Sequence, residues 1–216
     1  SLAVPFIENQ GQKDPQVAFY AQTLGGTLFV RKDGAMVYAL PGQVLSEAAA
    51  VRSREAGKVR GHQRSGTGVS IFRGDLNLPQ VPAYDEIALG EAAPGVELRL
   101  QACGGRVEKF FHVAPGADAS AVTMTVEGAD PLSVTQDGSL AAGKVVFSAP
   151  VAFQEGPKGR ETVDVAYVAE GNRYGFRLGP YDRSRELVID PLTSLATTYF
   201  GGTNNDVGYC VTADSA

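Results

Sequence analysis

Apolar and polar residues alternate along most of this 216-residue chain with a period of two. The clearest runs lie at residues 17–22, 122–127, 162–167 and 173–178. Because successive side chains of a β-strand point to opposite faces, these runs predict strands with one buried and one solvent-facing side. Helical periodicity is not sustained in any long segment, so we expect roughly fifteen strands and no long helix.

Turn-forming residues separate these runs. Gly, Pro, Asn and Asp cluster at residues 32–34, 104–105, 114–116, 136–138, 156–159 and 170–172. This spacing is typical of strands joined by hairpins and short loops in sandwiches. We therefore predict an all-β fold, an antiparallel β-sandwich with one or two lobes.

The end of this sandwich is marked by Asp190-Pro191, which follows the strand-like segment Leu187–Ile189. Proline lacks the N–H that a strand needs to continue its ladder, so the last strand should end here. The sandwich is then expected to span residues 1–191, with candidate lobes at 1–90 and 91–191. The remaining residues, 192–216, are predicted to form a strand-like tail.

One segment, Gly42–Gly68, breaks the alternating pattern. It contains no Phe, Tyr or Trp and is rich in Ala, Ser, Arg and Gly. A short helix over Leu45–Glu55 with Ser46 as its N-cap fits the local sequence. The segment is also basic, with five positive residues against two negative ones: Arg52, Arg54, Lys58, Arg60, Arg64, Glu47 and Glu55. We interpret it as a solvated surface loop, and the alternative is a basic arm for an acidic partner or a polysaccharide.

The charge balance narrows the range of partners. The chain has 24 acidic and 19 basic residues, a formal net charge of −5, which argues against nucleic acid as the main partner. No apolar run approaches the ~18 residues that span a bilayer, so we do not expect a membrane-spanning protein. The chain starts at Ser1 with no signal peptide. We interpret this start as processed, with secretion through a signal peptide that has been removed.

Catalytic motifs are absent from the sequence. There is no G-x-S-x-G, P-loop or C-x-x-C-H motif, and only two histidines, His62 in a predicted loop and His112 in a predicted strand. We therefore predict a protein that is not an enzyme and has no cofactor. The two cysteines, Cys103 and Cys210, are too few and too scattered for a zinc site. If the protein is extracellular, we expect them to form a disulfide.

Two further candidates have simpler explanations. Asn204, Asn205 and Asp206 carry oxygen ligands in a Gly-flanked turn and are weak calcium candidates. Their spacing does not follow a calcium loop, so an Asx-turn is the preferred interpretation and no metal site is predicted. The eight tyrosines could form a carbohydrate platform, but most lie in alternating segments, which favours packing in the core or on sheet faces.

The combined motifs resemble a known bacterial family. They are Pro5–Gln12 (PFIENQGQ), Val107–Asp118 (VEKFFHVAPGAD), Pro150–Glu155 (PVAFQE) and Tyr181–Pro191 (YDRSRELVIDP). Their order resembles the N-terminal β domain of unknown function that precedes SBBP (seven-bladed β-propeller) repeats in bacterial extracellular proteins. The resemblance is weakest at 42–78, where Val69–Asp75 replaces the family's usual strand. It implies a β architecture and an extracellular or cell-surface location, and it supplies no catalytic residue.

The tail resembles the start of one SBBP repeat, with Tyr199-Phe200-Gly201-Gly202-Thr203 followed by Asp206. Half a propeller blade cannot bury its own apolar face. Five apolar residues are therefore expected to mediate assembly: Tyr199, Phe200, Val207, Tyr209 and Val211. We predict a structural protein that assembles with itself, as a filament or surface layer, by strand pairing through this tail. The alternative is the N-terminal module of a larger propeller surface protein, used in adhesion or ligand binding, with other surface proteins or glycans as partners.

Overall fold

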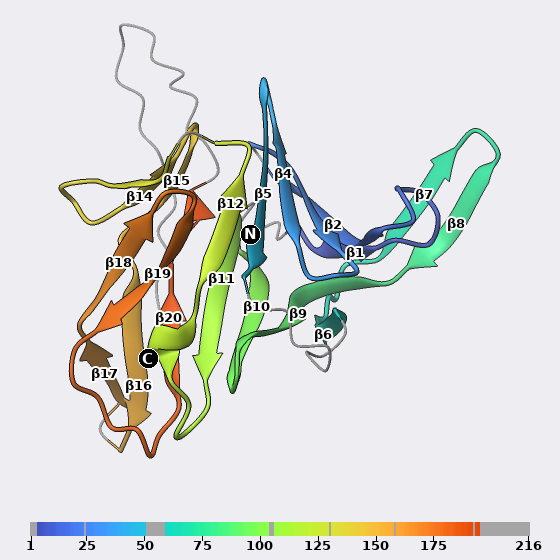
Figure 1. Ribbon diagram of the computed structural model, residues 1–216. Coiled ribbons are helices and arrows are strands. Elements are labelled where there is room, and N and C mark those ends of the chain that lie inside the picture. The colour runs from blue at the N-terminus through green and yellow to red at the C-terminus, as the bar shows by residue number, and fades with distance from the viewer. Residues whose placement is uncertain are drawn as a thin grey trace, which may run out of the picture.

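The computed structural model describes residues 4–23, 25–50, 59–103, 106–129, 131–157, 159–191 and 193–194. Throughout these residues the chain forms short strands, and every strand pair is antiparallel. The one helical element in this part of the chain is a single 3₁₀ turn, Ala119–Ala121. The predicted all-β fold of antiparallel sheets is confirmed (Figure 1).

Most strands belong to one large sheet of 15 strands. Its order is β17-β16-β20-β11-β10-β9-β1-β2-β3-β4-β5-β12-β19-β18, and β6 pairs with β9 beside this path. The strands of the N-terminal half are β1 (Phe6–Glu8), β2 (Val17–Thr23), β3 (Gly26–Arg31), β4 (Met36–Leu40), β5 (Gln43–Ala49), β6 (Arg60–Arg64) and β9 (Ala83–Ala93). Those that follow are β10 (Val96–Cys103), β11 (Arg106–Val113), β12 (Met124–Glu127), β16 (Val151–Gly156), β17 (Gly159–Val163), β18 (Val165–Glu170), β19 (Arg173–Leu178) and β20 (Leu187–Asp190).

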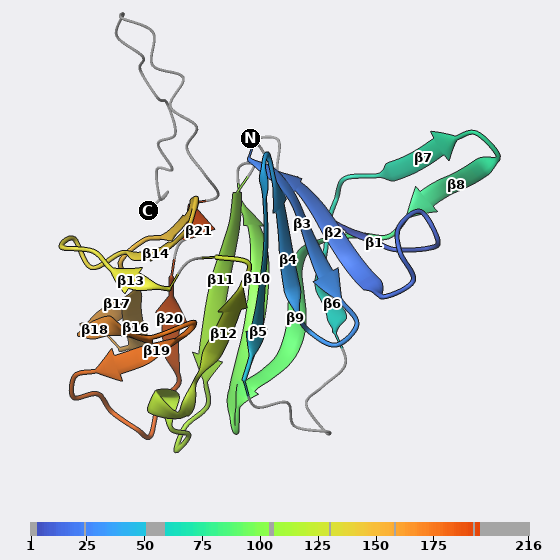
Figure 2. The same ribbon diagram turned by 45° about the horizontal axis from the view of Figure 1, so that its top comes forward.

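The large sheet curls round so that its two end strands follow one another in the chain. Its terminal strands, β17 and β18, are separated in sequence by Asp164 alone, so the chain itself joins the two ends of the path. The carbonyl oxygen of Asp164 accepts a hydrogen bond of 2.8 Å from the Gly179 amide, which holds this junction against the end of β19. The result is a nearly closed sheet whose inner face encloses the core (Figure 2).

The core follows from the alternation in each strand. In β2, Val17, Phe19 and Ala21 are buried as the pattern predicts, and Tyr20 on the other face is buried as well. Aromatic rings fill the centre, where Phe111 and Phe176 meet edge to face at 5.1 Å between ring centroids. Four of the eight tyrosines are almost fully buried, as expected for tyrosines that pack in the core: Tyr20, Tyr38, Tyr167 and Tyr174.

Two small sheets complete the fold. One has the order β13-β14-β15-β21, with β13 (Ser133–Val134), β14 (Leu140–Ala142), β15 (Val145–Phe147) and β21 (Thr193–Ser194). The other is a hairpin of β7 (Val69–Arg73) and β8 (Leu76–Val81), which projects away from the body of the molecule (Figure 1).

The interpretation of Gly42–Gly68 as a loop is wrong at both of its ends. Residues 43–49 form β5 and residues 60–64 form β6, so His62 also lies in a strand and not in a loop. The short helix expected from Leu45 is wrong over the described residues, because β5 is hydrogen-bonded between β4 and β12. Residues 162–167 likewise divide into two strands, since the chain passes from β17 to β18 at Asp164.

Strands from the two candidate lobes share one sheet. β5, from the first half of the chain, pairs with β12 from the second half. Gly128 follows β12 with a φ of +83°, and a Cβ at this position would overlap the carbonyl oxygen of Val44. Glycine is therefore needed here for the close approach of the two segments as well as for its backbone conformation.

Candidate functional site

The most unusual group of side chains lies inside the core. Glu47 of β5 and Lys109 of β11 are both fully buried, although charged residues are rarely enclosed without a partner. Two tyrosines complete the group, Tyr38 of β4 and Tyr174 of β19. We refer to these four residues as the buried cluster.

Strand alternation directs each of these side chains inward. Lys109 lies between Val107 and Phe111, which are buried on the same face of β11. Glu47 follows Leu45, another inward position of β5. β5 and β11 are not neighbours in the sheet order, so the two charged groups meet across the interior.

The contacts of the buried cluster are mutual and short. Lys109 Nζ donates to Glu47 Oε1 at 2.5 Å and to the Tyr174 hydroxyl at 2.6 Å. The Tyr174 hydroxyl in turn donates to Glu47 Oε1. Tyr38 donates from its hydroxyl to Glu47 Oε2 at 2.9 Å. Both oxygens of the Glu47 carboxylate therefore accept hydrogen bonds, as a buried charge requires.

Aromatic rings surround the ammonium group. Lys109 Nζ lies 4.5 Å from the centroid of Phe147, 5.2 Å from that of Tyr174 and 5.9 Å from that of Phe111. Burial lowers the pKa of Lys109 below its ordinary value, because the charged form loses its hydration. The pKa values of Tyr38 and Tyr174 are raised, first by burial and then by the nearby Glu47 charge.

The sequence interpretation missed this cluster, although one signal was present. Lys109 occupies an inward position in the alternating segment Val107–Val113, where an apolar residue is expected. Such a break in the pattern marks a buried lysine that needs a partner. The sequence does not identify Glu47 as the partner of Lys109, because the residues around Glu47 favour a helix or a loop.

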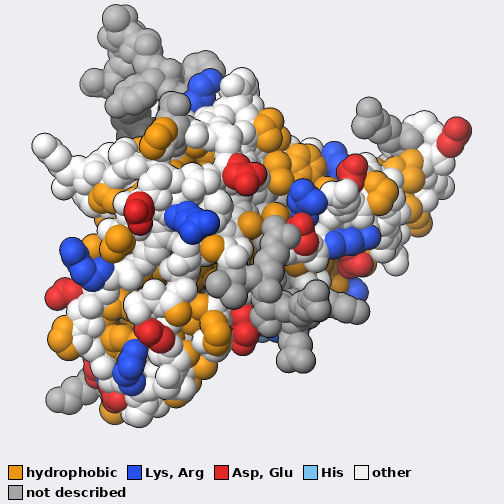
Figure 3. Space-filling model, viewed as in Figure 1, with side chains coloured by type: hydrophobic (Ala, Val, Ile, Leu, Met, Phe, Trp, Pro, Cys, Tyr) orange, Lys and Arg blue, Asp and Glu red, His pale blue; other side chains and the backbone are white. Residues whose placement is uncertain are grey.

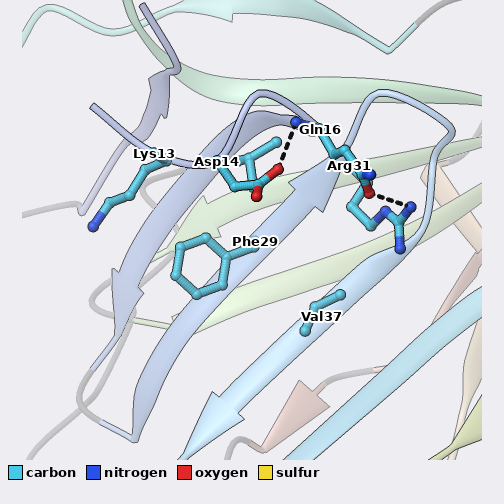
Figure 4. Close-up of a pocket in the computed structure, with 7 residues that line it drawn as sticks. Lys13, Asp14, Gln16, Phe29, Arg31 and Val37 are labelled. Carbon is cyan, nitrogen blue, oxygen red and sulfur yellow. Dashed lines mark hydrogen bonds between the residues drawn. The ribbon is translucent and has the colours of Figure 1, made fainter. Parts of the chain in front are cut away.

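A second candidate is a surface pocket of about 380 Å³ on the outer face of β2, β3 and β4 (Figure 4). Phe29 and Val37 form an apolar wall, and Lys13 and Arg31 lie on either side of Phe29. Arg31 donates to Gln16 Oε1 at 2.7 Å, while Lys13 Nζ lies 4.9 Å from the Tyr20 ring centroid. The Asp14 carboxylate also lines the pocket and Asp33 pairs with Arg31 at 3.5 Å, so charges of both signs lie beside the apolar wall. An apolar wall with a few polar groups suits a small ligand with an apolar body.

The two histidines lie apart from both candidates. His112 of β11 contacts Glu186 at 3.0 Å, and His62 of β6 contacts Glu86 at 3.1 Å. Over the described ranges, no group of three or more His, Cys, Asp or Glu side chains is placed to hold a metal ion.

Most of the predicted site residues lie outside the described residues. These are the calcium candidates Asn204, Asn205 and Asp206, the assembly residues Tyr199, Phe200, Val207, Tyr209 and Val211, and Cys210. Cys103 is described: it ends β10, is half-buried and pairs in register with Arg106 across the β10–β11 hairpin. The Cys103–Cys210 disulfide and the assembly role of the tail stay predictions.

Fold and site together define an antiparallel all-β domain with a charged pair enclosed in its core. The chain belongs to the family described as a domain of unknown function, DUF7948, whose model matches residues 6–192. All four motifs quoted for the resemblance overlap this range. No curated protein and no solved structure matches the chain. Within the described part of the chain, no helix has the length and apolar character needed to cross a membrane.

Proposed function

We propose that this chain is a non-enzymatic, extracellular structural protein that assembles with itself by strand pairing through residues 192–216. The observation that supports this most is β21, which adds Thr193 and Ser194 to the edge of β15. The register pairs Ser194 with Val146 and Thr193 with Phe147. Thr193 and Ser194 thus extend a sheet edge of their own chain, and we propose that the residues after them pair in the same manner with a sheet edge of a second copy.

The sequence that follows has the pattern of such a strand. Val207, Tyr209 and Val211 alternate with Gly208, Cys210 and Thr212. Acceptor edges are available in the described structure, where β17 and β18 end the large sheet and each pairs with a single strand. Open edges with unpaired backbone groups are templates for added strands. The similarity of the motifs to domains that precede SBBP repeats supports the extracellular or cell-surface location.

Removal of residues 195–216 tests the proposal. The full chain is expected to form oligomers or filaments in light scattering and electron microscopy, while the truncated chain is monomeric with unchanged far-UV circular dichroism. A finer test replaces Val207, Tyr209 and Val211 by Ser, with Asn204, Asn205 and Thr212 replaced by Ser as the matched control. Equal assembly of the truncated and full chains, or a monomeric full chain, would contradict the proposal.

The second candidate is an N-terminal module of a larger propeller surface protein that serves in adhesion or ligand binding. The surface pocket at Phe29 favours this candidate, because Phe29 offers an apolar surface for a sugar ring and Lys13 offers a cation for an acidic group, beside the carboxylate of Asp14. Calorimetric titration with oligosaccharides that contain uronic acids would test it. Binding should be lost in Phe29→Ala and Lys13→Ala and kept in Lys144→Ala, which changes an exposed lysine outside the pocket.

A further inference from the structure

We infer that the Glu47 and Lys109 side chains join in the folded protein to form an amide cross-link across the core. The reacting groups are already in contact, with Lys109 Nζ 2.5 Å from Glu47 Oε1. Both side chains are enclosed, at 1% and 0% exposure for Lys109 and Glu47. Intramolecular reactions between well-oriented groups reach effective concentrations of about 10⁵ M or more, and this contact holds the amine beside the carboxyl group.

Each step of the condensation has a group in place. In the neutral form of the pair, the lone pair of Nζ attacks the carboxyl carbon of Glu47. Tyr38 donates a hydrogen bond to Oε2 at 2.9 Å, which stabilises the negative charge that develops on this oxygen. Oε1, which carries the carboxyl proton in this neutral form, is then the leaving oxygen.

Tyr174 is placed to carry the proton. Its hydroxyl contacts both Lys109 Nζ, at 2.6 Å, and Glu47 Oε1. It can therefore accept a proton from the attacking nitrogen while it donates its own to the leaving oxygen. The Nζ–C bond forms, the C–Oε1 bond breaks, and one water molecule leaves. The step needs no oxidant, reductant or metal.

The apolar surroundings favour this reaction over a persistent ion pair. Burial of an ammonium and a carboxylate among aromatic rings is costly, which promotes proton transfer to the neutral amine and acid. Phe147 and Phe111, whose ring centroids lie within 6 Å of Nζ, limit the access of water that would reverse the reaction. The product would connect β5 to β11, which lie apart in the sheet order and 62 residues apart in the chain.

Mass spectrometry of the reduced, folded 216-residue chain tests the inference. The wild-type protein should be lighter than its sequence by one water molecule, and a protease digest should contain a branched peptide that links Glu47 to Lys109. The digest is needed because dehydration at Asp33-Gly34 or Asp137-Gly138 gives the same mass. Lys109→Met should have its full sequence mass, and the exposed-site control Lys144→Met should keep the loss.

Two further variants keep the test decisive if Lys109→Met does not fold. Glu47→Leu combined with Lys109→Met removes both charges and should fold with its full mass. Tyr174→Phe retains both reacting groups but lacks the proton carrier, so the linked peptide should form at least tenfold more slowly after refolding. A folded wild-type protein with its full sequence mass, or a linked peptide that joins other residues, would overturn the inference.

Discussion

Glu47 and Lys109 show how single residues shape this core. Four of the described buried residues are polar or charged. Glu47 and Lys109 are the charged ones, and Ser139 and Gln154 are neutral. A buried charge is tolerated when its partner and its hydrogen bonds are in place. If either residue is replaced alone, the charged side chain of the other stays buried without a partner of opposite charge.

A first prediction concerns the order of stability among variants of this pair. Lys109→Met and Glu47→Leu should each lose about 3–5 kcal/mol or more in free energy of unfolding, because an unpaired polar group stays buried and the amide link cannot form. The double variant should be more stable than either single variant, since no unpaired charge remains in the core. Urea unfolding followed by circular dichroism measures this order.

The matched control is an exposed ion pair, Arg160 with Glu155 at 2.9 Å, whose side chains are 68% and 65% exposed. Arg160→Met should change the free energy of unfolding by less than about 1 kcal/mol. The prediction that Glu47 and Lys109 stabilise each other would be contradicted by a double variant that is no more stable than the single variants.

A second prediction concerns Asp190 at the end of β20. Burial, followed by the charge of Glu108, raises the pKa of Asp190 to about 6, and no described residue donates a hydrogen bond to its Oδ1. The folded state therefore holds this proton more tightly than the unfolded state. The contribution of Asp190 to stability falls as the pH rises from 3.8 through 6.

Asp190→Asn changes the free energy of unfolding by an amount that should depend on pH. The change should be about 1 kcal/mol more favourable at neutral pH than in acid, a value reduced for the partial solvent access of Asp190. Asp137→Asn is expected to show the opposite trend. Hydrogen bonds, first from Thr135 and then from Ser139, lower the pKa of Asp137, so its contribution is lost as the pH falls. Urea unfolding at acidic and neutral pH distinguishes the two, and an effect of Asp190→Asn that is independent of pH would refute the prediction.

At the scale of elements, the β7–β8 hairpin differs from every strand around the core. Phe72 is 70% exposed, and hydrophobic side chains lie open along the projecting hairpin, at the right of Figure 3. An isolated two-stranded hairpin is only marginally stable in water. The hairpin therefore contributes little to the stability of the domain.

A third prediction follows from this contrast. Phe72→Ala should change the free energy of unfolding by no more than about 0.5 kcal/mol, because its ring is already in water. Phe111→Ala should cost about 3–5 kcal/mol, because it leaves a cavity among the rings of the core. Thermal or urea unfolding of both variants measures the difference, and similar losses would show that the hairpin is packed in solution.

At the scale of the whole molecule, one curled sheet links both halves of the chain. β9 pairs with β10 and β5 pairs with β12, so strands from residues 1–90 and 91–191 depend on each other for partners. Their apolar side chains form a single cluster that runs from Phe6 to Ile189.

A fourth prediction is a single cooperative unfolding transition. Neither half can complete its sheet alone, so melting curves from far-UV circular dichroism and from tyrosine fluorescence should coincide. Fragment 1–90, expressed alone, should not fold. Two separate transitions, or an independently folded fragment, would show that the halves are autonomous lobes.

A fifth prediction concerns the link between the domain and its tail. A Cys103–Cys210 bond within one chain would close a loop of about 107 residues and stabilise the folded state by about 4–5 kcal/mol in the chain-entropy model. Non-reducing mass spectrometry of native material should detect a peptide that joins the two cysteines. The detection of Cys103 and Cys210 as two unmodified thiols would show that this disulfide does not form.

The candidate site was largely beyond sequence analysis. Lys109 could be recognised as a polar residue at an inward position, because alternation within β11 is local. Its partner Glu47 could not be recognised as an inward-facing residue, because the neighbouring Ser46, Ala48 and Ala49 have the composition of a helix or loop. Pairing with β4 and β12 overrides that local preference, as tertiary context often does for strands.

The sequence by itself determined most of the elements: the strands outside β5 and β6, most of their inward faces, many of the turns and the end of β20 at Asp190-Pro191. These features depend on neighbours within a few residues, through alternation and through the missing N–H of proline. Only the tertiary structure decided the sheet order, the strand character of β5 and the meeting of Glu47 with Lys109. These features depend on contacts between segments distant in the chain, such as Glu47 and Lys109, which are 62 positions apart, and no local pattern specifies them.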